Sequence, residues 1–376
     1  MDKPEILIVG AGLMGRAAAY FFRNHPQGPF PVLLADHDEA VLDSAEKFLN
    51  DGARVHTMRL DVTRSDMLLR ALTGVKVCLS CVPYFLNPAI ARACLSLGVN
   101  YVDLGLKADV TDEILKMDED CRARGVAFIP DTGFSPGLLN IVVWELVHRF
   151  KKCDDVRLWA GGLPQVPTGP LNYTAFFSIH GLVNEYFEDA REIRNGKAVT
   201  VPSLSDLETV EFPGHGVYEA FVTSGGTSTL PKTLEGKVNR LSYKTMRYPG
   251  HMEALEYLRD LGLADLKPYT FGCGELSPRE MLVRVLEAKL PKDVADIVLV
   301  RVLATGDGGR HETIELVVKP DAKSHLSAME QVTGFPAAAV TLAILQGKVP
   351  PGAHAQETVI PFAWMKEQLG KFGITI

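Results

Sequence analysis

The sequence predicts an α/β protein in which a doubly wound parallel sheet is followed by an α+β domain with a mainly antiparallel sheet. The first 130 residues alternate short apolar runs with longer amphipathic stretches, as strands do when helices connect them in parallel. Residues 155–320 instead hold longer runs of β-branched residues between Gly- and Pro-rich loops. The length of 376 residues, about twice the usual span of one domain, agrees with two domains.

Composition and charge exclude several classes of protein. Hydrophobic residues make up 47% of the chain, which is enough for sizeable cores and too much for overall disorder. The net charge of −7 comes from 46 acidic and 39 basic residues mixed along the chain, so we expect no nucleic-acid partner. No apolar run approaches the roughly 20 residues that span a bilayer, and the N-terminus shows no signal-peptide pattern. We therefore expect a cytoplasmic protein without a membrane partner.

The six cysteines are too few and too irregularly spaced for a disulfide framework. Cys78 and Cys81 form a Cys-x-x-Cys pair inside the strand-like run Val75–Val82, where residues three apart point to opposite faces. The pair is therefore interpreted as two small core residues rather than as a zinc or redox site, and no metal is expected.

The elements of the first domain follow from its apolar pattern. The expected strands are Ile6–Val9, Val32–Ala35, Arg54–Met58, Val75–Cys81, Tyr101–Asp103 and Val126–Ile129. The expected helices are Leu13–Asn24, Glu39–Asn50, Ser65–Leu72, Pro88–Leu97 and Thr111–Arg124. Six strands separated by helices match the strand count of a complete dinucleotide-binding domain.

The second domain begins after a turn-rich connection at residues 131–137. A helix is expected over Leu138–Phe150, and the Ala-rich run Phe335–Leu345 predicts a helix that returns to the first domain. The clearest strands between them are Val156–Ala160, Asp296–Ala304 and Thr313–Val318. The expected divisions are 1–132 for the nucleotide, 133–332 for substrate binding and dimerisation, and 333–376 for the returning segment.

A glycine-rich turn follows the first strand, with Gly10, Gly12 and Gly15 in the pattern G-x-G-x-x-G. Gly10 allows the tight turn, Gly12 lets a pyrophosphate approach the backbone, and Gly15 allows the helix to pack closely on the strand. Leu13 and Met14 open the helix whose N-terminal N–H groups would face the phosphates. The strand before and the helix after disfavour a turn without a ligand. The pattern predicts a Rossmann domain that binds a dinucleotide.

The second strand runs into Asp36, 26 residues after Gly10, where a carboxylate accepts hydrogen bonds from the adenosine ribose. A 2′-phosphate would be repelled there, Asp38 adds to the repulsion, and no arginine adjacent in sequence neutralises it. NAD is therefore expected rather than NADP. The alternative role, a cap for the following helix, fits Asp38 better than Asp36.

Two further pairs of residues follow the ends of strands. Asp61 and Val62, after the third strand, either border the adenine ring or cap the next helix. Val82 and Pro83, after the fourth strand, complete the expected cofactor-binding residues.

Nine runs spread over nearly the whole chain carry a family resemblance. They are Cys81–Asn87, Gly98–Gly105, Ile129–Asn140, Phe177–Tyr186, Arg194–Gly196, Val201–Ser205, Glu219–Thr229, Tyr243–His251 and Thr333–Ala337. With these runs the sequence resembles the saccharopine dehydrogenase family, and within it the members that deaminate L-lysine at its ε-carbon. The resemblance implies NAD-dependent oxidation at an amine-bearing carbon, a site between the two domains and a homodimer.

The resemblance implies that an amino-acid substrate meets residues of the run Tyr243–His251. Arg247 and Lys244 are the candidate cations for its carboxylate, and His251 is a candidate proton acceptor or water activator. If the run is one strand, Arg247 and His251 share a face and Lys244 points away. The alternative is a surface-exposed charged strand, which is as strong an interpretation as substrate binding for Lys244.

The strand ends supply two more candidate catalytic residues. Tyr84 follows the fourth strand at the carboxyl edge of the sheet, where contact with the nicotinamide or substrate is favoured over packing. Asp103 ends the fifth strand at the same edge, where it would hold the nicotinamide ribose or the substrate ammonium, or cap a turn. Lys107 is a general base only if desolvated, and an exposed lysine is the favoured interpretation.

Three residues are assigned to the substrate from their place in the family-like runs. Asn140 lies in the run that links the two domains. Thr223 and Ser224 open a hydroxyl-rich loop that would bind the amino-acid end of the substrate. Without the resemblance this loop would be only a turn.

The leading hypothesis is an enzyme that converts L-lysine to 2-aminoadipate 6-semialdehyde, which cyclises to piperideine-6-carboxylate, with release of ammonia. A rival within the same class acts on saccharopine or carboxynorspermidine. Their second carboxylate predicts an additional cation in the site. A hypothesis of another class is a non-catalytic NAD-binding sensor, which the set of Tyr84, Arg247 and His251 disfavours.

Overall fold

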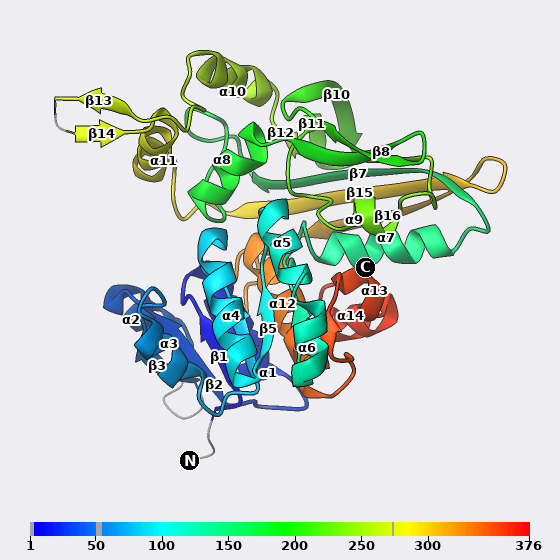
Figure 1. Cartoon of the computed structure of the whole chain (residues 1–376). Helices are drawn as coiled ribbons and strands as arrows, with labels where there is room; N and C mark the ends of the chain where they lie inside the picture. The colour runs from blue at the N-terminus through cyan, green and yellow to red at the C-terminus, as the bar shows by residue number, and fades with distance from the viewer. Residues whose placement is uncertain (1–3, 50–54, 273) are drawn as a thin grey trace. The chain divides into compact units, whose positions relative to one another are not determined.

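The computed structural model describes residues 4–49, 55–272 and 274–376 (Figure 1). The chain divides into two compact units, and each is described by itself. Unit 1 comprises Met1–Glu145 together with Glu330–Ile376, and unit 2 comprises Leu146–Met329. The division falls 13 residues after the first expected boundary and three before the second. The expected start of a strand at Arg54, the expected end of a helix at Asn50, and Cys273 lie outside the described residues.

Unit 1 contains a seven-stranded sheet in which every pair of neighbouring strands is parallel. Its order is β17-β6-β5-β4-β1-β2-β3, so the chain turns back at β1 and β4, as in a doubly wound sheet. The fold class expected from the sequence is confirmed. The strands are β1 Ile6–Val9, β2 Val32–Asp36, β3 Val55–Arg59, β4 Val77–Ser80, β5 Asn100–Asp103, β6 Ala127–Ile129 and β17 Gly352–Ala353.

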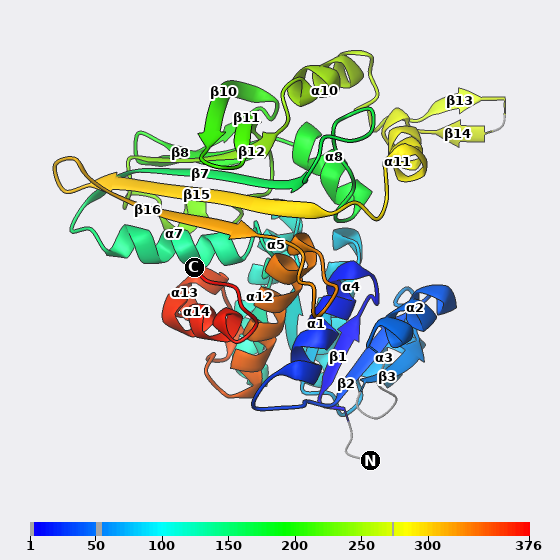
Figure 2. The ribbon, with the colours of Figure 1, turned by 180° about the vertical axis from the view of Figure 1, so that it is seen from behind.

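Helices cover both faces of this sheet. A large apolar core joins one face to four helices, α3 Ser65–Leu72, α4 Asn87–Leu97, α5 Ala108–Leu115 and α6 Asp118–Arg124. Figure 2, seen from behind, shows α1 and α12 on the other face. The remaining helices of the unit are α1 Leu13–Asn24, α2 Glu39–Leu49, α7 Leu138–His148, α12 Ala328–Leu345, α13 Gln356–Val359 and α14 Phe362–Gly370. Of these, α7 and α12 run across the boundary into unit 2. A short 3-10 turn, η1, spans Tyr84–Leu86.

Two helices differ from their expected bounds because distant residues set their ends. The single helix expected over Thr111–Arg124 is two, and the second begins at Asp118, whose carboxylate accepts the N–H of Ala353 in β17 (2.9 Å). Helix α12 begins seven residues before its expected start. There the buried Asp296 of unit 2 accepts the N–H groups of Ala328 (2.7 Å) and Met329 (2.8 Å). Neither contact leaves a periodic signal in the sequence.

Unit 2 is built on a mixed, mainly antiparallel sheet, as expected. Its main path is β10-β11-β12-β7-β15-β16, with β8 and β9 attached to β12, and only the β12–β7 pair is parallel. The strands are β7 Cys153–Pro164, β8 Ala190–Arg194, β9 Lys197–Val201, β10 Ser205–Phe212, β11 Gly216–Val222, β12 Arg240–Arg247, β15 Asp296–Gly306 and β16 Arg310–Val318.

In the described part of unit 2, four helices and a small hairpin complete the fold. The sheet carries an apolar core with Trp159 of β7, Phe212 of β10 and Met246 of β12. The hairpin of β13 Tyr269–Phe271 and β14 Gly274–Leu276 forms a sheet of its own. The helices are α8 Ile179–Phe187, α9 Leu230–Thr233, α10 His251–Asp260 and α11 Pro278–Lys289.

Two further observations concern membrane and metal. Among the described residues, α12 is the one helix long and apolar enough to cross a membrane, and 89% of that stretch is buried within the protein. Cys78 is buried in β4 and Cys81 follows that strand, both as free thiols. In the part of the chain that the structure describes, no group of three or more His, Cys, Asp or Glu side chains is placed to hold a metal ion.

Candidate functional site

In the glycine-rich turn of unit 1, Gly10 and Gly15 are required by the fold, whereas Gly12 is available for binding. Gly10 has a φ of +96°, and a Cβ there would lie 2.8 Å from the carbonyl oxygen of Cys81. A Cβ on Gly15 would lie 1.7 Å from the carbonyl oxygen of Gly10, so α1 can start against the turn only with glycine. Gly12 is exposed, and a Cβ there would meet nothing within 4 Å. The open backbone at the start of α1, where Leu13 is exposed and Met14 buried, fits a bound pyrophosphate.

Asp36 ties the end of β2 to this turn. Its Oδ2 accepts the N–H of Ala11 (2.8 Å), and its Oδ1 accepts that of Asp38 (3.0 Å). Asp38 in turn accepts the N–H of Ala40 at the start of α2, which is the capping role expected for it. Arg59 on β3 pairs in register with Asp36, and its guanidinium contacts Glu39 (3.1 Å). The strand next to Asp36 therefore carries an arginine, which the residues adjacent in sequence did not show, and its guanidinium is paired with Glu39.

The other expected cofactor residues lie along the same edge of the sheet. Asp61 forms a local turn, because its Oδ1 accepts both the N–H (2.9 Å) and the hydroxyl (2.6 Å) of Thr63, and these bonds lower its pKa. Val82 lies beside the glycine turn, with a methyl carbon 3.2 Å from where a Cβ on Gly10 would be. Pro83 precedes the 3-10 turn that carries Tyr84, and Val62 is half-buried.

Tyr84 and Lys107 form a contact at the carboxyl ends of β4 and β5. The half-buried Tyr84 ring has the Nζ of Lys107 5.7 Å from its centre. Among the described residues no carboxylate pairs with this ammonium group, so its charge remains available to an anion. Lys107 is half-buried, rather than the exposed lysine favoured from the sequence.

Asp103 is a buried carboxylic acid whose two oxygens differ in their hydrogen bonds. Its Oδ1 accepts the N–H groups of Gly105 (2.7 Å) and Asp131 (3.1 Å). Its Oδ2 is buried without a hydrogen-bond partner of good geometry in the described chain, and the buried hydroxyl of Tyr101 is a neighbour that lowers the carboxyl pKa. Burial raises the pKa of Asp103 to about 6, because the charged form is poorly solvated. Asp103 can therefore cap the turn through Oδ1 and take part in chemistry through Oδ2.

Two residues that the sequence reasoning missed support Asp103. Asp131 is buried with a φ of +62°, and its carboxylate accepts the hydroxyl of Thr111 (2.9 Å). Gln356 of α13 donates its side-chain N–H to the carbonyl oxygen of Asp131, while its own Oε1 is buried without a partner in the described chain. Asp131 lay in the turn-rich run already noted, but no signal pointed to Gln356, which is far away in sequence.

The Arg247 cluster of unit 2 is a buried network rather than the exposed charged strand of the alternative interpretation. Arg247 is 3% exposed and donates from Nε to the hydroxyl of Tyr186 (2.8 Å). A terminal nitrogen lies 3.3 Å from Glu185, and the guanidinium stacks on Tyr173 at 4.6 Å. Glu185 also accepts the hydroxyl of Thr245 (2.7 Å), which shares the Arg247 face of β12.

His251 joins this network from a helix, so its expected place on a strand is wrong. β12 ends at Arg247, Gly250 has a φ of +89°, and His251 begins α10. Its Nε2 lies 2.9 Å from the Tyr186 hydroxyl and its Nδ1 2.9 Å from the carbonyl oxygen of Leu171. Because Tyr186 accepts from Arg247, it donates to Nε2, and Nδ1–H donates to Leu171. Burial, with Arg247 nearby, lowers the pKa of His251 to about 3.

Comparison with known proteins covers both units. A sequence model of the saccharopine dehydrogenase C-terminal domain matches residues 133–374, and one of the saccharopine dehydrogenase NADP binding domain matches residues 6–129. The chain belongs to the saccharopine dehydrogenase family. The resemblance to this family noted from the sequence is thereby confirmed.

Relatives within the saccharopine dehydrogenase family are distant. The mitochondrial alpha-aminoadipic semialdehyde synthase of Rattus norvegicus is 26% identical over 280 residues, which are 71% of this chain and 29% of the rat protein. The saccharopine dehydrogenase [NADP(+), L-glutamate-forming] of Schizosaccharomyces pombe is 22% identical over 78% of this chain and 66% of its own length. The chain thus spans under a third of the length of the first of these relatives.

A solved structure supports the fold of the family. The apo saccharopine dehydrogenase (L-Glu forming) of Saccharomyces cerevisiae matches with a TM-score of 0.73 and 18% identity, over 99% of this chain and 98% of that one. At this identity the match shows the fold alone.

The remaining residues that the family resemblance singled out are all at least partly buried. Lys244 points away from the Arg247 face, as expected, and contacts Asp206 (3.1 Å) and Glu208 (2.9 Å), so its charge is already neutralised. Thr223 shares a hydrogen bond with Thr245 (2.7 Å). Ser224 is half-buried and donates its N–H to the backbone carbonyl of Glu185, and Asn140 is buried at the start of α7. Their substrate roles stay predictions.

Proposed function

We propose that the protein oxidises the ε-carbon of L-lysine with NAD and releases ammonia, giving 2-aminoadipate 6-semialdehyde. The observation that carries this proposal is Asp103 at the carboxyl edge of a dinucleotide-binding sheet, a buried acid with a pKa of about 6 whose Oδ2 makes no hydrogen bond with the described residues. The ε-ammonium has an ordinary pKa of about 10.4, so it must lose a proton before hydride can leave the carbon. An acid that is ionised at neutral pH and poorly solvated is a suitable acceptor for that proton.

Different residues of unit 1 bind the cofactor and accept the proton in the proposed reaction. Bound NAD would accept the hydride, and the turn at Gly12 would hold its pyrophosphate. Asp103 Oδ2 takes a proton from the ammonium, and the backbone N–H groups of Gly105 and Asp131 fix the carboxylate through Oδ1. Water then adds to the oxidised carbon and ammonia leaves. One lysine, one NAD and one water thereby yield the semialdehyde, NADH and ammonium with a proton.

A second candidate is oxidation of saccharopine or a similar substrate with a second carboxylate. The names of the relatives support it, and so does Lys107, because its ammonium has no carboxylate partner among the described residues. The sequence reasoning required one additional cation for this candidate, and Lys107 meets that requirement at the edge that carries Tyr84 and Asp103.

Product analysis separates these candidates. The protein is incubated with NAD and, in turn, lysine, saccharopine, ornithine or carboxynorspermidine, and NADH, ammonia and glutamate are measured. NADH and ammonia from lysine support the proposal, whereas NADH and glutamate from saccharopine alone overturn it in favour of the second candidate. No turnover with any substrate favours a non-catalytic sensor.

The pH profile tests the role of Asp103. The activity of the wild type, as kcat/KM, should fall as the pH drops through about 6, because Asp103 becomes protonated. Asp103→Asn should lower kcat by at least about a hundredfold and remove that acid limb. The matched control is Asp120→Asn, on exposed α6, which should keep both. An Asp103→Asn variant that retains the wild-type acid limb would remove Asp103 from the reaction.

The choice of NAD over NADP is tested at two neighbouring positions. Asp36→Ala should weaken NAD and reduce its advantage over NADP, because the charge that repels a 2′-phosphate is lost. Arg59→Ala should weaken NADP more than NAD, since Arg59 pairs in register with Asp36 on the neighbouring strand and its guanidinium could turn to a 2′-phosphate. Dissociation constants by fluorescence titration measure both effects. A wild type that prefers NADP, as the family's domain name would suggest, contradicts the assignment.

Homodimerisation and a cytoplasmic location are proposals that rest on the resemblance and on the composition. Light scattering coupled to gel filtration tests the first of them.

A further inference from the structure

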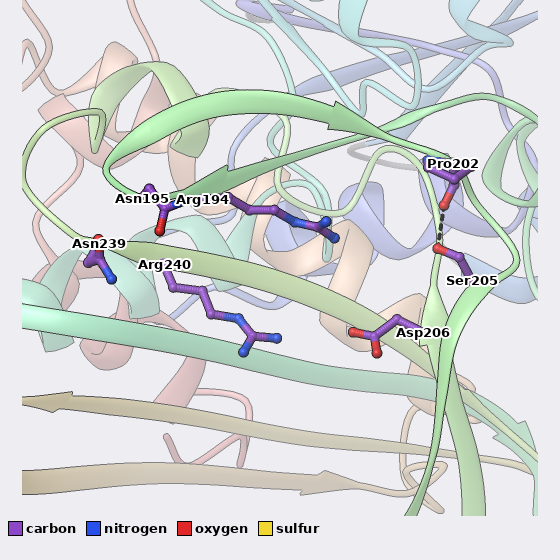
Figure 3. A pocket seen from close by; sticks show the side chains of 7 residues that line it. All are labelled: Arg194, Asn195, Pro202, Ser205, Asp206, Asn239 and Arg240. Atoms are coloured by element: carbon purple, nitrogen blue, oxygen red, sulfur yellow. Dashed lines mark hydrogen bonds between the residues drawn. The ribbon is translucent and has the colours of Figure 1, made fainter.

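A polar hollow of about 620 Å³ opens in unit 2, at the end of β8 and the start of β12 (Figure 3). Its size is ample for a small molecule. Only one of its lining residues, Pro202, is apolar. The others are Arg194, Asn195, Ser205, Asp206, Asn239 and Arg240.

The two arginines of the hollow face each other across neighbouring strands. Arg194 ends β8 and Arg240 begins β12, and they are direct partners in the antiparallel register. Like charges placed opposite each other destabilise a sheet unless something neutralises them. The hollow is separate from the Arg247 cluster, because seven residues of extended strand between Arg240 and Arg247 span about 23 Å.

A carboxylate holds one edge of the Arg194 guanidinium, and another lies farther from that of Arg240. Glu192 Oε2 lies 3.1 Å from Nε and 3.0 Å from one terminal nitrogen of Arg194. Asp155 lies 3.9 Å from Nε of Arg240 and is bound more closely by Arg157 (2.7 Å). The second terminal nitrogen of Arg194 and both of Arg240 make no hydrogen bond with any residue the structure describes. Guanidinium groups with open donors are suited to a carboxylate.

Asp206 supplies the opposite charge. Figure 3 shows its carboxylate pointing toward the guanidinium groups of Arg194 and Arg240 from the far side of the hollow. Its Oδ2 contacts Lys244 (3.1 Å), while its Oδ1 has no partner in the described chain. The side chain is half exposed, so a ligand reaches it.

The lining of the hollow presents both signs of charge, because Arg194 and Arg240 stand against Asp206. The neighbouring ion pairs Arg157–Asp155, Arg194–Glu192 and Lys244–Glu208 lie around it. A molecule with a negative and a positive end would therefore meet a partner for each end.

We infer that this hollow binds a zwitterionic α-amino acid with an uncharged polar side chain, at a site separate from the one that carries Asp103. The α-carboxylate meets Arg194 and Arg240, and the α-ammonium meets Asp206 Oδ1. Asn195, Asn239 and Ser205 supply amides and a hydroxyl for the side chain. The family-like runs Arg194–Gly196 and Val201–Ser205, which the proposed oxidation does not use, form part of this site.

Calorimetric titration of the full chain without cofactor tests the inference, with L-glutamine as the probe. L-Glutamine should bind in the micromolar to millimolar range and tighter than L-leucine, because the lining is polar. Glutaramate, which is glutamine without its α-ammonium, should bind more weakly. Arg240→Ala should weaken glutamine by roughly tenfold or more. Asp206→Asn should remove the preference for glutamine over glutaramate while both still bind.

Matched variants keep a folding defect apart from a binding defect. Arg240→Ala leaves Asp155 paired with Arg157, and Asp206→Asn leaves Lys244 paired with Glu208, so thermal unfolding should change little. Arg284→Ala, which removes an exposed arginine of α11 paired with Glu280, should bind glutamine as the wild type does. No binding of glutamine, equal binding of inorganic phosphate, or an unchanged affinity in Arg240→Ala would each overturn the inference.

Discussion

At the scale of single residues, burial changes the chemistry that the residue types imply. His251 has the side chain of a proton acceptor, yet both ring nitrogens are occupied, and its lowered pKa keeps it neutral at physiological pH. It therefore orients Tyr186, which orients Arg247, and the three act as one network. Asp103 shows the opposite effect, because burial moves its pKa toward neutrality, where a carboxylic acid can exchange protons.

The network of His251 predicts how stability depends on pH. The native imidazole stays neutral down to about pH 3, whereas the unfolded one takes up a proton below about 6.5, so stability is lost as the pH falls between these values. The slope from this one group is about 1.4 kcal/mol per pH unit. His251→Gln should be less stable at pH 7 but lose stability less steeply on acidification, as measured by urea unfolding.

The control for this prediction is His311→Gln, an exposed imidazole of β16 outside the network. Parallel stability curves for the wild type and His251→Gln between pH 6 and pH 4 would show that His251 is not held neutral.

At the scale of elements, the glycines of the turn between β1 and α1 differ in role: Gly15 is needed for stability and Gly12 for NAD binding. Gly15→Ala should lower the free energy of unfolding by several kcal/mol, because its Cβ would lie 1.7 Å from a backbone oxygen. Gly12→Ala should fold as the wild type does, since nothing lies within 4 Å, and should weaken NAD by roughly tenfold or more where the Cβ meets the pyrophosphate. Chemical denaturation and NAD titration of both variants measure the two effects.

The two variants act as controls for each other. A Gly12→Ala variant that loses unfolding free energy as well as NAD affinity would show that this glycine is also needed for folding.

Several helix starts are decided by carboxylates that are distant in sequence. Glu219 of β11 accepts the N–H groups of Gly250 (2.8 Å) and Met252 (2.6 Å), which fixes the first turn of α10 and with it His251. Asp296 does the same for α12. By contrast, Ser277 caps α11 locally through the N–H of Glu280 (3.1 Å), as a sequence rule would anticipate.

At the scale of the whole molecule, unit 1 is assembled from both ends of the chain. β17 pairs with β6, Gln368 of α14 contacts His25 after α1 (2.9 Å), and Phe372 packs on Phe21. A chain truncated after Gly347 should therefore lose hydrogen-exchange protection throughout β1 and β2 and bind NAD weakly. The strands β7 and β15 should stay protected, because their sheet lies wholly in unit 2.

A truncated chain that binds NAD with full affinity would contradict this prediction. A truncated chain that loses hydrogen-exchange protection in β7 and β15 but keeps it in β1 and β2 would also contradict it.

The sequence by itself determined the doubly wound sheet and the dinucleotide turn. Those features depend on local periodicity and on glycines a few residues apart, and α1 and α3 match their expected bounds. It also placed Asp36, Tyr84 and Asp103 at one edge, because the carboxyl ends of parallel strands meet there.

Only the tertiary structure decided what surrounds those residues. The pairing of Arg59 with Asp36, the burial of Asp103, the enclosure of Arg247 and the helical start at His251 depend on contacts between residues far apart in the chain. Such contacts set burial and hydrogen bonding, which shift a pKa by several units without changing the residue type. The local pattern of residue types does not predict these long-range contacts.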